Sequence, residues 1–263
     1  MKLTLEQEIT RLSREQAKLA EQVVSAELEL ETAKTETAQF QRRYYEMVGR
    51  FYAQLDELDA QIADEQAELS PDDAAAQTHA QAAQEQARKS AEEAGLIEAQ
   101  PPPPLIITPQ LKQAFRRAAM MMHPDRATTE PERLRRHGLM IKVNLAYERG
   151  DQQAIENLVL EFIQDPGMRE TEDPENCELI PDLGVELRIL KVIRRTGQLQ
   201  RRMDEIQEEL YEKKQSDIYK LKITIERAEL KGGKPLSNLA EQLLQELSER
   251  KIRLEEITTH KLY

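Results

Sequence analysis

The chain has 263 residues, of which 33% are charged and 4% are aromatic, and it contains no tryptophan. One large globular core normally needs more large apolar side chains, so this composition favours long helices that bury narrow stripes. With a formal net charge of −12, the surface as a whole repels nucleic acid, which is therefore not expected as a partner.

No disulfide framework or membrane span is expected. Cys177 is the only cysteine, which excludes an intramolecular disulfide and a metal site made of cysteines. Residues 1–8 have no apolar signal core, and no run approaches the roughly 18 apolar residues of a membrane span. We therefore expect a cytoplasmic protein without a membrane partner.

Residues 1–69 are predicted to form an N-terminal coiled-coil helix. Apolar residues recur in alternating steps of three and four from Leu5 to Phe51, which is the 3.5-residue repeat of a coiled-coil seam. The apolar positions that begin at Leu55 follow an extra step of four, as in a stutter. Residues 70–108 then read as an Ala- and Gln-rich helix, started by Ser70-Pro71, and a stiff proline-rich linker.

Residues 109–164 are predicted to form a compact helical module. The first helix runs to Met122 and ends at His123-Pro124, because the residue before a proline is disfavoured in the α region. A second helix to Arg149 and a third from Asp151 are expected to follow. Residues 109–150 hold nine basic and four acidic side chains, so they are a basic island in an acidic chain.

Residues 165–184 are rich in proline and acids and are predicted to be an acidic linker. The heptad pattern then returns in residues 185–263, which are expected to form the C-terminal coiled-coil helices. The simplest arrangement pairs these helices antiparallel with the N-terminal helix and places the module at one end. Pairing between chains, in a homo-oligomer, would bury the same stripes. The predicted fold is all-α, with long coiled-coil helices flanking a small helical hairpin.

The tripeptide His123-Pro124-Asp125 lies between two amphipathic helices. Leu111 to Met122 before it carry an apolar face at steps of three and four, and Asn144-Leu145-Ala146-Tyr147 follows it. We expect the two helices to pack antiparallel, with the tripeptide exposed at the tip. The expected supporting core consists of Phe115, Ala119, Met140, Val143, Asn144 and Tyr147.

This combination of a basic Leu-Lys-x-Ala-Phe-Arg helix, His-Pro-Asp and Asn-x-Ala-Tyr resembles the J-domain of DnaJ-type co-chaperones. The flanking heptads are similar to a bacterial subgroup in which a J-like module lies between coiled coils. The resemblance covers about residues 105–164. It implies docking on a DnaK-type (heat-shock protein 70) chaperone, stimulation of its ATPase, and recruitment to an unknown protein client. The implied chaperone-binding residues are His123, Pro124, Asp125, Lys112, Arg116, Arg117 and Arg126.

The sequence departs from the family before residue 109. The usual first J-domain helix, with Tyr-Tyr near its start, is missing, and the nearest Tyr44-Tyr45 lies far upstream. The alternative prediction is a structural or adaptor coiled-coil protein whose degenerate J-like module does not activate a chaperone. His-Pro-Asp would then be only a helix stop.

Catalytic residues are not expected. There is no Ser-His-Asp constellation, glycine-rich phosphate loop or paired carboxylate motif. His79, His137 and His260 have no ligand spacing to His123, so neither a metal nor a cofactor is predicted. A J-like protein of this kind would regulate another protein's ATPase without being an enzyme.

Overall fold

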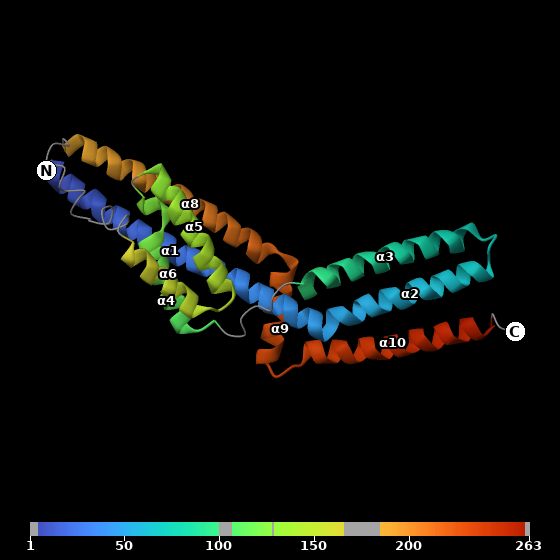
Figure 1. The fold of residues 1–263 in the computed structure, drawn as a ribbon. Coiled ribbons are helices and arrows are strands. Elements are labelled where there is room, and N and C mark those ends of the chain that lie inside the picture. The colour runs from blue at the N-terminus through green and yellow to red at the C-terminus, as the bar shows by residue number, and fades with distance from the viewer. Residues whose placement is uncertain (1–4, 100–106, 128, 166–184, 261–263) are drawn as a thin grey trace. The chain divides into compact units, whose positions relative to one another are not determined.

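The computed structural model of the chain is all-α, as predicted: the described residues form helices and no strand (Figure 1). None of these helices combines the length and the apolar character needed to cross a membrane. The structure describes residues 5–99, 107–127, 129–165 and 185–260. The proline run at 101–104 and nearly all of the predicted acidic linker therefore lie outside the described residues.

Two compact units divide the chain, and neither is a continuous segment. One consists of Met1–Glu36 and Pro103–Ser216, and the other of Thr37–Pro102 and Asp217–Tyr263. Helix α1 (Leu5–Tyr44) contributes to both. The units therefore cut across the consecutive segments that the sequence analysis predicts.

In the first unit, α1 pairs with α8 (Val185–Gln215) along a parallel seam. Val23 and Leu30 of α1 share a core with Leu199 and Ile206 of α8. Arg202 bonds to Glu27, and Glu209 pairs with Lys34, so seven residues forward on one helix correspond to seven forward on the other. The prediction of antiparallel pairing was therefore wrong. A heptad stripe has the same spacing in both directions, so the repeat alone does not specify the orientation.

The second unit contains an antiparallel helix pair. Helix α2 (Arg50–Leu69) packs against α3 (Ala74–Ala99), and the Gln84 amide donates to the Asp64 carboxylate at 2.7 Å. Alanines fill the contact, including the buried Ala63 and Ala80. Small side chains let these two helices approach closely.

A second parallel pair completes this unit. Helices α9 (Asp217–Leu230) and α10 (Pro235–His260) follow each other in the chain, and α10 runs parallel to α2. Leu55 packs in one core with Leu243, and further along both helices Arg250 donates to Asp59 at 2.8 Å.

A π-helical turn, η1 (Tyr45–Gly49), joins α1 to α2. Such a turn inserts one extra residue into the α-helical repeat. The side chains that follow it are therefore shifted around the helix axis. It lies just before the position where the sequence pattern predicts a stutter at Leu55, so the change of phase in the apolar pattern has a structural counterpart.

The central module belongs to the first unit. It comprises α4 (Pro109–Met122), η2 (Pro124–Arg126), α5 (Glu130–Glu148) and α6 (Gln152–Gln164). Side-chain oxygens cap all three α-helices and satisfy amide groups that would otherwise lack partners. The caps are Thr108 on α4, Thr129 on α5 and Asp151 on α6.

The apolar faces of these three helices form one core with α1. Phe115 and Ala119 of α4 and Val143 and Tyr147 of α5 are fully buried, and Val24 of α1 belongs to the same cluster. The module is therefore packed along the side of α1. The expectation that the antiparallel arrangement places the module at one end of the paired helices was therefore wrong.

Candidate functional site

The His-Pro-Asp loop contains an internal hydrogen bond. Helix α4 ends at Met122 because His123 takes an extended conformation before Pro124, with φ −59° and ψ 132°. The backbone amide of Asp125 then donates to Nδ1 of His123 at 3.2 Å. Since Nδ1 acts as an acceptor here, the proton of a neutral imidazole is on Nε2.

That second ring nitrogen points into the body of the unit. His123 is only 7% exposed, and its Nε2 donates to Oε1 of Glu27 on α1 at 3.0 Å. The same oxygen accepts from Nε of Arg202 on α8 at 3.2 Å. We call these three residues the His123 clasp. It joins the loop to both helices of the parallel pair.

The expectation of an exposed tripeptide was therefore wrong. His123 is buried, while Pro124 and Asp125 are half-buried and Arg126 is exposed. The tripeptide does end the α4 helix, but α1 and α8 pass beside it. Their proximity depends on tertiary packing, which the local motif does not encode.

Glu27 is held as an anion despite its burial. Burial alone raises the pKa of this carboxyl group, but the hydrogen bond from His123 and the charge of Arg202 outweigh that effect and lower the pKa below its ordinary value. An ionised carboxylate in a site of low exposure is a strong hydrogen-bond acceptor. The clasp is therefore a charge-assisted contact.

A small cavity of about 30 Å³ lies beside the loop, with His123, Asp125 and Met120 in its lining. Asp125 Oδ2 is buried and accepts no hydrogen bond from a described residue, although it lies 3.4 Å from Nδ1 of His123. Room for about one water molecule next to an unsatisfied carboxylate oxygen is suitable for a solvent bridge. The Asp125 side chain as a whole is 24% exposed, although Oδ2 itself is buried.

The predicted cations of α4 point to solvent. Arg116 and Arg117 are exposed and Lys112 is half-buried. None of the three forms an ion pair with another described residue, whereas many other cations in the chain do. Arg126 is used differently, because its guanidinium donates to the carbonyl of Met120 and closes the end of α4.

The predicted supporting residues lie together beneath the loop. The rings of Phe115 and Tyr147 meet edge to face with centroids 4.9 Å apart, and Ala119, Val143 and Met140 belong to the same core. The Tyr147 hydroxyl shares a hydrogen bond of 2.9 Å with Thr32 of α1, and burial raises the pKa of its phenol. Asn144 is half-buried beside them.

Two residues that matter to the loop were missed by the sequence analysis, Glu27 and Arg202. Another, Arg136, was counted only as part of the basic island. It is 1% exposed, bonds to Glu132 at 2.8 Å and donates to the carbonyl of Met121 at 2.8 Å. It therefore fastens α5 to the end of α4. The Glu132/Arg136 spacing of four was the available signal for this pair.

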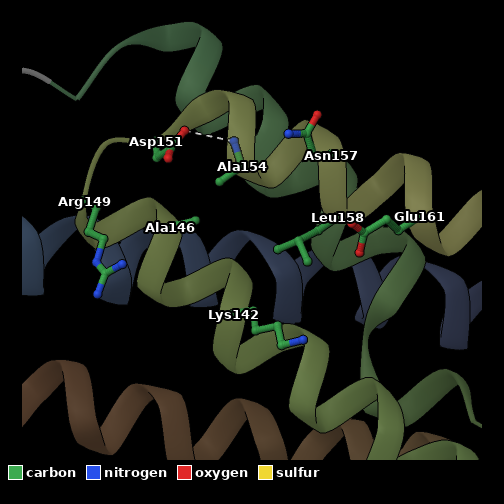
Figure 2. Close-up of a pocket in the computed structure, with 8 residues that line it drawn as sticks. All are labelled: Lys142, Ala146, Arg149, Asp151, Ala154, Asn157, Leu158 and Glu161. Atoms are coloured by element: carbon green, nitrogen blue, oxygen red, sulfur yellow. Dashed lines mark hydrogen bonds between the residues drawn. The ribbon is translucent and has the colours of Figure 1, made fainter.

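A second depression, of about 300 Å³, runs between α5 and α6 (Figure 2). Figure 2 shows Lys142 on α5 and Arg149 just after its last residue, with Asp151 and Glu161 on the α6 side. The charges are mixed, and no nucleophile and base lie together in this lining. Within the described ranges, no group of three or more His, Cys, Asp or Glu is placed to hold a metal ion.

The candidate site is thus a partly buried loop, with exposed cations on the helix before it and the buried His123 clasp behind it. The chain matches no family model, no curated protein and no solved structure. The resemblance to a J-domain therefore depends on the motif residues and their placement alone.

Proposed function

We propose that the chain is a J-domain-like co-chaperone that docks on a DnaK-type chaperone through α4 and the His-Pro-Asp loop. The supporting observation is the exposed, basic surface of α4. Lys112, Arg116 and Arg117 have no ion-pair partner among the described residues and lie on the helix that delivers Asp125. Cations held on a rigid helix attract an acidic surface and mainly raise the rate of encounter.

Asp125 gives this encounter its specificity. Its side chain is 24% exposed, and its buried Oδ2 has no hydrogen-bond donor among the described residues. An arginine of the chaperone would make a directional, charge-assisted pair with it. The chain would contribute contacts and no bond-breaking chemistry, and the chaperone's own ATPase would be the activity that changes.

The His123 clasp sets a condition on this function. A partner that contacts the imidazole must displace Glu27, because Nε2 is already bonded to that carboxylate in a site of low exposure. We therefore propose that the described arrangement is the resting one. Docking by α4 comes first, and engagement of His123 follows when the clasp opens.

The test is the steady-state ATPase rate of the cognate DnaK-type protein with this chain added. Wild type should stimulate it, whereas Asp125→Asn, which keeps the shape and removes the charge, should not. Reversing the charge of Arg116 should weaken stimulation more at low salt than at high salt. Lys142→Glu on α5 is a matched control: it is exposed and without an ion pair among the described residues, and it should behave as wild type. Equal rates with wild type and Asp125→Asn would reject the proposal.

A structural or adaptor role is the second candidate, and the clasp itself favours it. A His-Pro-Asp loop bonded to Glu27 of α1, which in turn bonds to Arg202 of α8, contributes to the stability of the unit whether or not a chaperone binds. On this alternative, Asp125→Asn leaves function in cells intact, while Leu199→Asp in the α1/α8 seam abolishes it. Loss of function with Asp125→Asn in a fully folded protein would reject the adaptor role.

A further inference from the structure

Helix α8 begins with a strongly basic stretch. Residues 187–203 contain six arginine or lysine side chains and no acid, whereas the next turns contain Asp204, Glu205 and Glu208. Aliphatic residues lie among the cations. Three of them are exposed to solvent: Leu187 at 53%, Leu190 at 60% and Ile193 at 52%. Large aliphatic side chains gathered on a basic helix face typically mark an interaction surface.

Leu187 and Leu190 belong to a second seam on α8. The seam that packs on α1 includes Leu199 and Ile206. A different set repeats on the other side in alternating steps of three and four, and we call it the outward seam. Its members are Leu187, Leu190, Arg194, Gly197 and Arg201. At roughly 100° per residue, each of them lies roughly 160–240° around the helix from Leu199.

The outward seam is free of partners within the described part of the chain. Arg194 and Arg201 are exposed and make no ion pair with a described residue, in contrast to Arg202, which bonds to Glu27 and Glu205. A Cβ built at Gly197 would have nothing within 4 Å. The backbone there is open to the close approach of another helix.

We propose that the outward seam binds an acidic helix of a partner protein. The 3.5-residue spacing fits knobs-into-holes packing with another helix. Apolar residues of the partner would cover Leu187 and Leu190, and its Asp or Glu would face Arg194 and Arg201. A second copy of this seam is a poor partner because like charges would meet. The outward seam contains none of the residues proposed to dock on the chaperone. It therefore extends the proposed function: the client would bind at the outward seam, and it would be a protein with an acidic helix.

The probe is a labelled synthetic helical peptide whose seam reads Leu, Leu, Glu, Ala, Glu, together with a peptide of reversed seam order. The control peptide carries Lys in place of both Glu. Binding to the full chain is measured by fluorescence anisotropy. We expect the acidic peptide to bind at least tenfold more tightly than the Lys peptide, with an affinity that falls as salt rises.

Charge exchange makes the test specific. In the double variant Arg194→Glu/Arg201→Glu, the preference should reverse, so that the Lys peptide binds and the Glu peptide does not. The double variant Arg14→Glu/Lys18→Glu, on exposed positions of α1, changes the net charge equally and should keep the wild-type preference. Leu190→Ser should weaken binding of both peptides to their matched proteins. Circular dichroism confirms that each variant is folded.

Several results would overturn the proposal. One such result is that neither acidic peptide, in either seam order, binds the chain. Another is that the α1 and α8 double variants lose affinity for the acidic peptide equally, because that indicates attraction by net charge only. If Arg194 and Arg201 bind anionic vesicles or an oligonucleotide more tightly than the acidic peptide, the ligand of this surface is a membrane or a nucleic acid and not a protein helix. Residues 166–184 contain six acids. If the peptide binds only after these acids are neutralised, the face is covered by the chain itself. Because no chaperone is present, none of these outcomes depends on the ATPase test.

Discussion

The His123 clasp predicts a measurable loss when Glu27 is replaced by alanine. The substitution removes the acceptor of two hydrogen bonds, from His123 at 3.0 Å and from Arg202 at 3.2 Å. Hydrogen bonds to charged groups contribute roughly 1.5–3 kcal/mol each. Arg202 is 35% exposed and regains water, so its share is at the low end. We expect the free energy of unfolding to fall by about 3 kcal/mol, and by about 1 kcal/mol for Glu27→Gln, which keeps one acceptor.

The assay is urea denaturation followed by circular dichroism, together with hydrogen exchange of the Asp125 amide that bonds to His123. Glu29→Ala is the matched control. It lies on the same helix and its ion pair with Lys214 is exposed, so its loss should cost at most about 1 kcal/mol. The helix propensity gained by introducing alanine is the same in both variants. If Glu27→Ala costs no more than Glu29→Ala, or if exchange at Asp125 is unchanged, the clasp does not hold the loop.

The clasp also predicts how stability depends on pH. The pKa of Glu27 is lower in the folded chain than its ordinary value of 4.5. Its contribution is therefore complete above pH 4.5 and is lost as the pH falls through the folded pKa. The stability difference between wild type and Glu27→Gln should shrink on acidification towards pH 3. A constant difference would indicate that the carboxylate charge is not what stabilises the clasp.

Three other substitutions test the packing. Phe115→Ala should lower the free energy of unfolding by about 3–5 kcal/mol in denaturant titration, because the ring is fully buried. Leu199→Asp should disrupt the α1/α8 seam and sharply increase proteolysis of the first unit, whereas Gln200→Asp, at an exposed position, should not. Burial raises the pKa of Glu31, so its charge opposes folding at neutral pH. Glu31→Gln should therefore raise the melting temperature at pH 7, corresponding to up to about 1 kcal/mol, and have no effect near pH 3; a lower melting temperature at pH 7 would contradict this.

Local signals predicted the module's helices well. Thr108 before Pro109 starts α4, and His123-Pro124 ends it, because capping and proline sterics act within a few residues. The apolar periodicity likewise identified Phe115 as a core residue and Leu199 as a seam residue. Helix ends and apolar stripes are determined by residues within a few positions of one another, so they can be read from the sequence.

Orientation and long-range contacts were not predictable in the same way. The seam through Leu199 reads equally well in either direction, so the parallel pairing with α1 could not be inferred. Glu27 is one of many acids on α1, and nothing in its neighbourhood marks it as the residue that meets His123 across the fold. Burial of that imidazole is a consequence of tertiary packing alone.

Parallel pairing has a consequence for synthesis of the chain. Glu27 and Arg202 are 175 residues apart, and the α1/α8 seam joins positions at a similar separation. At roughly 5–20 residues per second, the apolar stripe of α1 emerges from the ribosome about 10–35 seconds before its partner exists. An antiparallel hairpin such as α2/α3 closes locally and without this delay. The nascent chain therefore passes through a period in which it exposes an unpaired seam, and during that period it is itself a potential client for chaperones.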